Sequence, residues 1–242
     1  MTTVALTTKP APAANTGDWL IPLGLLALAF IPVVAGAFRV TTLVSQAPIT
    51  PDNARFFASP LPVLLHVVSV TIYSILGAFQ FSPGIRRRRP GWHRAAGRLL
   101  VGAGLVAALS GLWMASFYAI VPTDSALLHG FRLFFGTAMA VSIVLGFLAI
   151  RRGNVAVHQA WMRRAYAIGM GAGTQALTQM PLVTILGKLD AATLAFAMGG
   201  AWVLNLAVAE WLIRKSRHEP TPSRPTQSAR AVTDANAAKD KR

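Results

Sequence analysis

Long apolar segments alternate with short polar ones along most of the chain. A helix of about 20 residues crosses a hydrocarbon core of roughly 30 Å, and backbone groups in lipid must hydrogen-bond within their own segment. The pattern therefore predicts an all-α fold, a polytopic membrane helical bundle of about six transmembrane helices. The expected spans are 19–38, 61–82, 96–120, 127–150, 165–186 and 191–213.

Polar segments flank the predicted spans at both ends. Residues 1–17 carry only one charge, on Lys9, and lack the basic start of a secretory signal. Residues 216–242 are rich in Ser, Pro, Thr and Ala with scattered charges, a composition that buries too little apolar surface to order itself. We expect disordered segments at 1–17 and 216–242 around a transmembrane domain at 18–215.

Composition favours lipid as the solvent of this chain. Hydrophobic residues make up 54% and charged residues 13%, with a mean hydropathy of +0.51. The net charge of +15 would suit a nucleic-acid-binding protein. However, the basic residues of this chain are separated by long apolar runs, which a nucleic-acid-binding face does not contain, so no nucleic-acid partner is expected. The chain has no cysteine, which excludes disulfides, thiolate metal sites and iron–sulfur clusters.

The basic residues near the span ends are distributed unequally. Cytoplasmic ends carry an excess of Lys and Arg. Four basic residues fall on one side, at Arg39, Arg55, Arg132 and Lys188. Thirteen fall on the other, at Arg86, Arg87, Arg88, Arg89, Arg94, Arg98, Arg151, Arg152, Arg163, Arg164, Arg214, Lys215 and Arg217. This asymmetry predicts a multi-pass protein of the cell membrane with both termini in the cytoplasm.

A stretch of sequence is repeated within the predicted bundle. Leu64-Leu65-His66 opens the second span, and Leu127-Leu128-His129 opens the fourth. Each of these spans ends in arginines, and a further histidine, His93 or His158, then precedes the next helix. Helices two to five are therefore predicted to form a duplicated four-helix core. The repeat sorts the histidines into an outer pair and an inner pair.

Paired histidines on facing helices predict a haem site. Neutral imidazole binds haem iron, and a bundle can offer one histidine from each side. The hypothesis is two haem b groups, one between His66 and His129 and one between His93 and His158, which would form a transmembrane electron path. Arginines near these histidines would pair with haem propionates, Arg132 at the outer site and Arg98, Arg163 and Arg164 at the inner site.

Two other interpretations stay open. The histidines and arginines could bind an anionic ligand or a lipid headgroup between the repeats, in a non-enzymatic binding or transport protein. They could also be interface anchors, because arginines at membrane surfaces reach lipid phosphates. Stripes of small residues after His93 and His158 would give a macrocycle room, or simply let helices approach closely. No hydrolase, zincin, phosphate-loop or dinucleotide motif is present.

Four stretches of the sequence carry a resemblance to a known family. They are Leu64-Leu65-His66, Gly91-Trp92-His93-Arg94-Ala95-Ala96-Gly97-Arg98, Gly111-Leu112-Trp113 and the run from Arg151 to Arg164. By these motifs the sequence from 60 to 185 resembles the bacterial membrane family called domain of unknown function 2306, a name that implies no activity. The order and sidedness of the four histidines are distantly similar to the cytochrome b561 family. That likeness implies a haem oxidoreductase with a quinol or an ascorbate-like donor.

Overall fold

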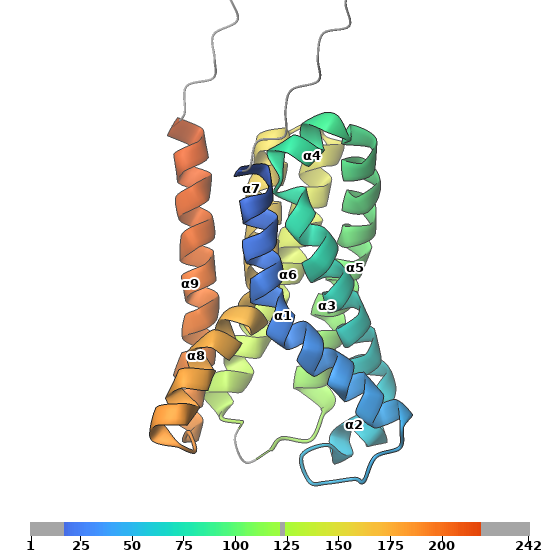
Figure 1. The fold of residues 1–242 in the computed structure, drawn as a ribbon, viewed down its shortest axis with the longest axis vertical. Coiled ribbons are helices and arrows are strands. Elements are labelled where there is room, and N and C mark those ends of the chain that lie inside the picture. The colour runs from blue at the N-terminus through green and yellow to red at the C-terminus, as the bar shows by residue number, and fades with distance from the viewer. Residues whose placement is uncertain (1–16, 122–123, 219–242) are drawn as a thin grey trace, which may run out of the picture. The chain divides into compact units, whose positions relative to one another are not determined.

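The computed structural model describes residues 17–121 and 124–218, which form nine helices and no strand (Figure 1). Five of these helices are long and apolar enough to cross a membrane. They are α1 (Gly17–Val44), α3 (Pro60–Gln80), α5 (Pro90–Phe117), α6 (Ala126–Arg151) and α9 (Ala191–His218). The expected all-α membrane architecture is confirmed, while the duplicated core and the orientation stay predictions.

Contacts group the chain into two units. The first extends to Ala209 and holds the four paired histidines and the two described cavities. The second begins at Glu210 and includes the last turns of α9, where the Lys215 ammonium lies 5.5 Å from the centre of the Trp211 ring. Gly17 and residues 216–218, which were expected in disordered segments, are helical. The other residues of these two segments, 1–16 and 219–242, lie outside the described residues.

The long helices extend beyond the apolar segments that predicted them. Helix α5 begins at Pro90 rather than at residue 96, with proline in its first turn, where the missing N–H costs nothing. Helix α1 continues to Val44 rather than to residue 38. Hydropathy locates only the part of a helix that lies in hydrocarbon, so polar turns at the interface were missed.

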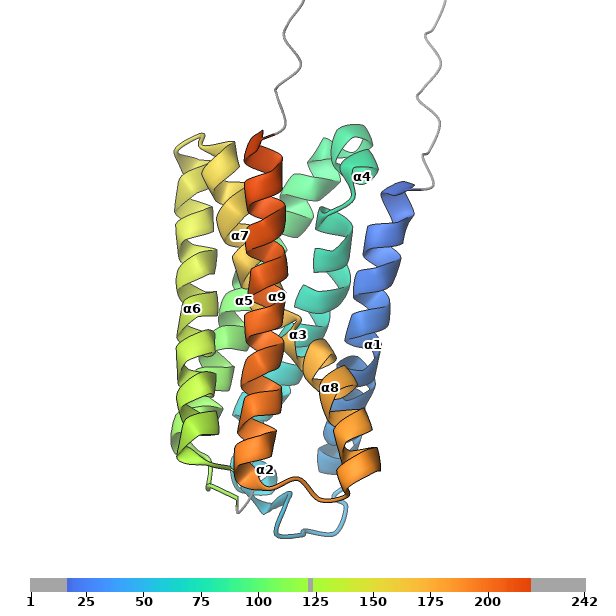
Figure 2. The same cartoon turned by 90° about the vertical axis from the view of Figure 1, so that its left-hand side faces the viewer.

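The fifth predicted span is wrong as a single helix. Residues 165–186 instead belong to α7 (Val155–Gly169) and α8 (Gly171–Leu186), which meet at Met170. Three glycines, at 169, 171 and 173, lower the helix propensity around this junction. The first unit has α4 (Pro83–Arg88) at one end and α2 (Ala54–Ala58) at the other. Helix α7 begins near the α4 end, and α8 continues towards the α2 end (Figure 2).

Side chains of α9 and α8 satisfy the backbone at the junction. In a continuous helix the Ala167 carbonyl would accept from Gly171, but here it accepts from Asn205 Nδ2 at 3.0 Å. The Asn205 side-chain oxygen accepts from Thr174 Oγ1 at 2.8 Å. On α8, Gln175 Nε2 donates to the Met198 carbonyl at 3.2 Å. Gln175 and Asn205 thus form hydrogen bonds between helices.

Helix α8 also packs closely against α1. Pro32 lacks an N–H, so the Leu28 carbonyl one turn earlier has no donor within its helix. Gly173 lies against that carbonyl, and a Cβ at position 173 would overlap the Leu28 oxygen. Helix α1 changes direction along its length, and its internal prolines, Pro22 and Pro32, account for the bend (Figure 1).

Two tyrosines fill the centre of the first unit. Tyr73 of α3 and Tyr166 of α7 are buried with ring centroids 5.6 Å apart, and the Tyr166 hydroxyl donates to the Ser74 carbonyl at 2.8 Å. A Cβ at Gly104 would lie 2.6 Å from the Tyr73 ring, so that ring occupies the space beside α5. The side of helix α3 that carries Ser69 and Tyr73 therefore points inward.

Replacing Gly173 with alanine should destabilise the protein. The added methyl group would press on the backbone of α1, and overpacking of this kind costs about 1–3 kcal/mol. For a chain of this size the melting temperature should fall by about 2–10 °C, measured by tryptophan fluorescence in detergent. The control is Gly102→Ala in α5, where a Cβ meets no atom within 4 Å. Equal melting temperatures for both variants would contradict the contact.

Candidate functional site

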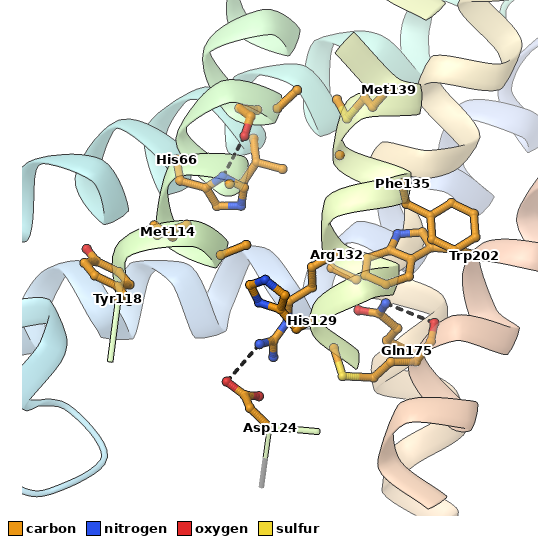
Figure 3. A pocket seen from close by; sticks show the side chains of 18 of the residues that line it. His66, Met114, Tyr118, Asp124, His129, Arg132, Phe135, Met139, Gln175 and Trp202 are labelled. Atoms are coloured by element: carbon orange, nitrogen blue, oxygen red, sulfur yellow. Dashed lines mark hydrogen bonds and ion pairs between the residues drawn. The ribbon is translucent and has the colours of Figure 1, made fainter. Parts of the chain in front are cut away.

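A cavity of about 560 Å³ lies between α3, α5, α6, the α7–α8 junction and α9 (Figure 3). This volume falls in the range of small-molecule and cofactor sites, roughly 300–1,000 Å³. Its apolar walls include Phe135, Met139, Ile168 and Trp202, and Phe135 stacks on Trp202 with ring centroids 4.9 Å apart. The cavity lies toward the α2 end of the first unit.

The structure brings His66 and His129 to this one cavity. His66 projects from α3 and His129 from the first turn of α6 (Figure 3). The start of α6 is fixed by Ser125, whose hydroxyl oxygen accepts from the Leu128 N–H at 3.2 Å. The two histidines that the sequence assigned to an outer pair therefore border the same space.

The ring of His66 is held in one orientation. Its Nδ1 lies 2.9 Å from the Ala107 carbonyl oxygen and 3.3 Å from Ser110 Oγ on α5. A carbonyl oxygen only accepts, so Nδ1 carries the proton and Nε2 of the neutral ring keeps its lone pair. Histidines that bind metals are commonly oriented by such a bond to the other ring nitrogen.

Small residues line the cavity beside the two histidines. They come from α5 and from the α7–α8 junction: Ala108, Gly111, Ala115, Gly169 and Ala172. A Cβ on Gly111 would lie 3.2 Å from His66 Cε1, so glycine leaves room for the ring. The small-residue stripes thus serve two purposes, because Gly104 packs under Tyr73 while Gly111 borders the cavity.

A cluster of two arginines and one carboxylate borders the cavity. Asp124 Oδ2 lies 2.9 Å from an Arg132 guanidinium nitrogen and 3.6 Å from one of Arg55. Arg55 also donates to the Ala119 carbonyl at 3.4 Å, and its Nε is buried with no hydrogen-bond partner. Arg132 was singled out from sequence, whereas Arg55 and Asp124 were not.

The short helix α2 covers this part of the first unit. Tyr118 donates to the Ser59 carbonyl at 2.6 Å, and the Phe56 and Tyr118 rings meet edge to face with centroids 5.4 Å apart. Burial raises the pKa of the Tyr118 hydroxyl, so it stays protonated as a donor at neutral pH. These contacts fix Arg55, which α2 carries, next to Asp124.

The second histidine pair lies in a different setting. His158 Nδ1 lies 2.9 Å from the Gly146 carbonyl oxygen, while His93 Nδ1 is buried without a partner. His158, Arg86 and Arg94 are all close enough to His93 to act on it electrostatically. A second cavity, of about 150 Å³, also borders His66. Neither of these two cavities is lined by His93 or His158.

The inner arginines named from sequence have different surroundings. Arg98 is exposed, and the Arg164 guanidinium lies 4.6 Å from the centre of the Trp161 ring. Arg163 is partly buried, with Arg86 as its electrostatic neighbour. Within the described part of the chain, no group of three or more His, Asp or Glu side chains is placed to hold a metal ion.

Comparison with known proteins places the chain in a family. The family described as "Predicted membrane protein (DUF2306)" matches residues 63–213. No curated protein and no solved structure matches the chain. The likeness to the cytochrome b561 family stays a prediction. The match covers more than half of the chain and includes all four paired histidines, so this integral membrane protein belongs to the DUF2306 family.

Proposed function

We propose that the protein is a membrane haem protein that holds a b-type haem between His66 and His129. The observation that carries this proposal is that imidazoles from α3 and α6 border one cavity, and that the Ala107 carbonyl leaves Nε2 of His66 with its lone pair. Two axial histidines are sufficient for haem, so the absence of a larger ligand cluster in the described residues does not conflict with it.

The surroundings of the two histidines suit a porphyrin. The small residues along α5 and at the α7–α8 junction give space beside the ligands, and Phe135 and Trp202 supply apolar walls. Arg132 and Arg55 at the cavity would pair with the haem propionates, with Asp124 keeping both guanidinium groups in place. A bound haem would supply one-electron chemistry, and the chain would ligate it, orient it and exclude water.

The proposal concerns one haem. A second haem at His93 and His158 lacks the same support, because neither described cavity reaches these residues. Electron transfer across the membrane, an oxidoreductase activity, and a quinol or ascorbate-like donor remain predictions from the sequence. The proposed outer haem is therefore the first step that needs a test.

An amphipathic anion is the second candidate for the same cavity. Arg55 and Arg132 share a single carboxylate, so the cluster keeps one excess positive charge beside apolar walls. A carboxylate bound to the arginines, with a hydrocarbon tail in the cavity, would match both features. This ligand needs neither histidine as a metal ligand.

The purified protein should show a Soret band that shifts on reduction with dithionite. Separate replacement of His66 and His129 with alanine should each abolish stable haem binding, because one axial ligand is then lost. His93→Ala is the matched control and should retain one haem per chain, quantified as the pyridine haemochrome. A colourless protein from haem-replete cells, with no spectrum after reconstitution, would rule the haem proposal out.

Haem-free protein tests the second candidate. Laurate should raise the melting temperature while dodecanol, which has the same chain without the charge, should not. Arg132→Gln should remove the laurate effect. The control is Arg39→Gln, which should preserve it, because the Arg39 guanidinium lies 4.3 Å from the Phe56 ring centre and Arg39 does not line the cavity. An equal response to laurate and dodecanol would exclude recognition of an anion.

A further inference from the structure

Helix α2 closes one side of the large cavity but has little structure of its own to hold it in place. Arg55 and Phe56 of this helix line the cavity. None of the five residues of α2 is buried, and the residue before it, Asn53, makes no side-chain capping bond to it. A single helical turn is not stable alone in water, because one or two hydrogen bonds do not offset the cost of ordering its backbone. The position of α2 therefore depends on contacts with other segments.

Three contacts with the segment that follows α5 hold α2 in place. The Tyr118 hydroxyl donates to the carbonyl of Ser59, the residue at which α2 ends, at 2.6 Å. The Phe56 and Tyr118 rings meet edge to face with centroids 5.4 Å apart. Arg55 donates to the Ala119 carbonyl at 3.4 Å. The side chains that make these contacts are only half-buried, which is typical of segments that open locally without unfolding the rest of a protein.

The residues that make these contacts also form part of the cavity wall. Arg55 and Phe56 line the cavity from α2, while Tyr118, Ala119 and Asp124 line it from the segment between α5 and α6. Asp124 Oδ2 lies 3.6 Å from a guanidinium nitrogen of Arg55, which joins the two parts of the wall once more. Movement of α2 away from Tyr118 would therefore separate the two parts and open the cavity at this end of the first unit (Figure 1).

We propose that α2 is a lid that opens to admit a ligand with charged groups to the cavity from the aqueous side of this end. A charged group crosses hydrocarbon only at high cost, so such a ligand does not enter between the apolar faces of the long helices. Lids of this kind move on a scale of microseconds to milliseconds. The lid concerns access to the cavity, so it goes beyond the proposed function and does not depend on haem being the ligand.

Alkylation of a single cysteine inside the cavity measures the opening of the lid. The chain has no cysteine, so Ala108→Cys creates its only thiol, at a position that lines the cavity and is 4% exposed. Haem-free full-length protein in nanodiscs is treated with iodoacetamide, a neutral water-soluble reagent, and the alkylation rate is followed by mass spectrometry. The rate should be at least about tenfold lower than for Ser45→Cys, whose thiol would be exposed outside the cavity.

Adding Tyr118→Phe should raise the alkylation rate at position 108 about three- to tenfold. The change keeps the ring but removes the hydrogen bond to Ser59, and the loss of one such bond shifts an opening equilibrium by this factor. The matched control is Tyr166→Phe, which removes a hydroxyl that donates to the Ser74 carbonyl at 2.8 Å and does not line the cavity. The control should leave the rate unchanged, because it does not touch the lid.

Three results would overturn the lid. The first is an unchanged alkylation rate with Tyr118→Phe, and the second is an equal rise with Tyr166→Phe. The third is a parent Ala108→Cys protein that reacts as fast as Ser45→Cys, because the cavity would then be open already. If Ala108→Cys does not fold, Ala115→Cys takes its place, since Ala115 also lines the cavity. The assay contains no haem, so a failure of the haem proposal leaves its result valid.

Discussion

A backbone buried in lipid has no water to hydrogen-bond, and the junction at Met170 depends on meeting that constraint. Asn205 bonds to the Ala167 carbonyl of α7 and to Thr174 of α8, so one side chain joins the two helices. Gly173 closes the other side of the junction against α1. Ile168, Gly169, Ala172 and Gln175 beside the break line the cavity. The cavity thus exists where a helix is interrupted and its backbone groups are satisfied from neighbouring helices.

The two ends of the first unit treat positive charge differently. At the cavity, Asp124 binds both Arg132 and Arg55 and holds them in place. At the α4 end, Arg86 and Arg94 act electrostatically on His93, and no acid lies between residues 53 and 123. The arrangement at the cavity suits a ligand with a large apolar body and acidic groups.

The sequence predicted the features that lipid imposes. Helix positions followed from the length of the apolar segments. It also assigned His66 and His129 to one end of the bundle. The break at Met170 was missed because both halves are apolar, although the glycines at 169, 171 and 173 were a usable signal. Arg55 was missed because its contacts to Ala119 and Asp124 join segments far apart in sequence.

The central claim is that His66 and His129 would both ligate one haem iron. Electron paramagnetic resonance of the oxidised, purified protein tests it most directly. The account predicts the low-spin ferric signal of an iron with two imidazole ligands, and the loss of this signal when His129 is replaced by alanine. A wild-type protein with only a high-spin signal, or with no haem signal, would contradict it.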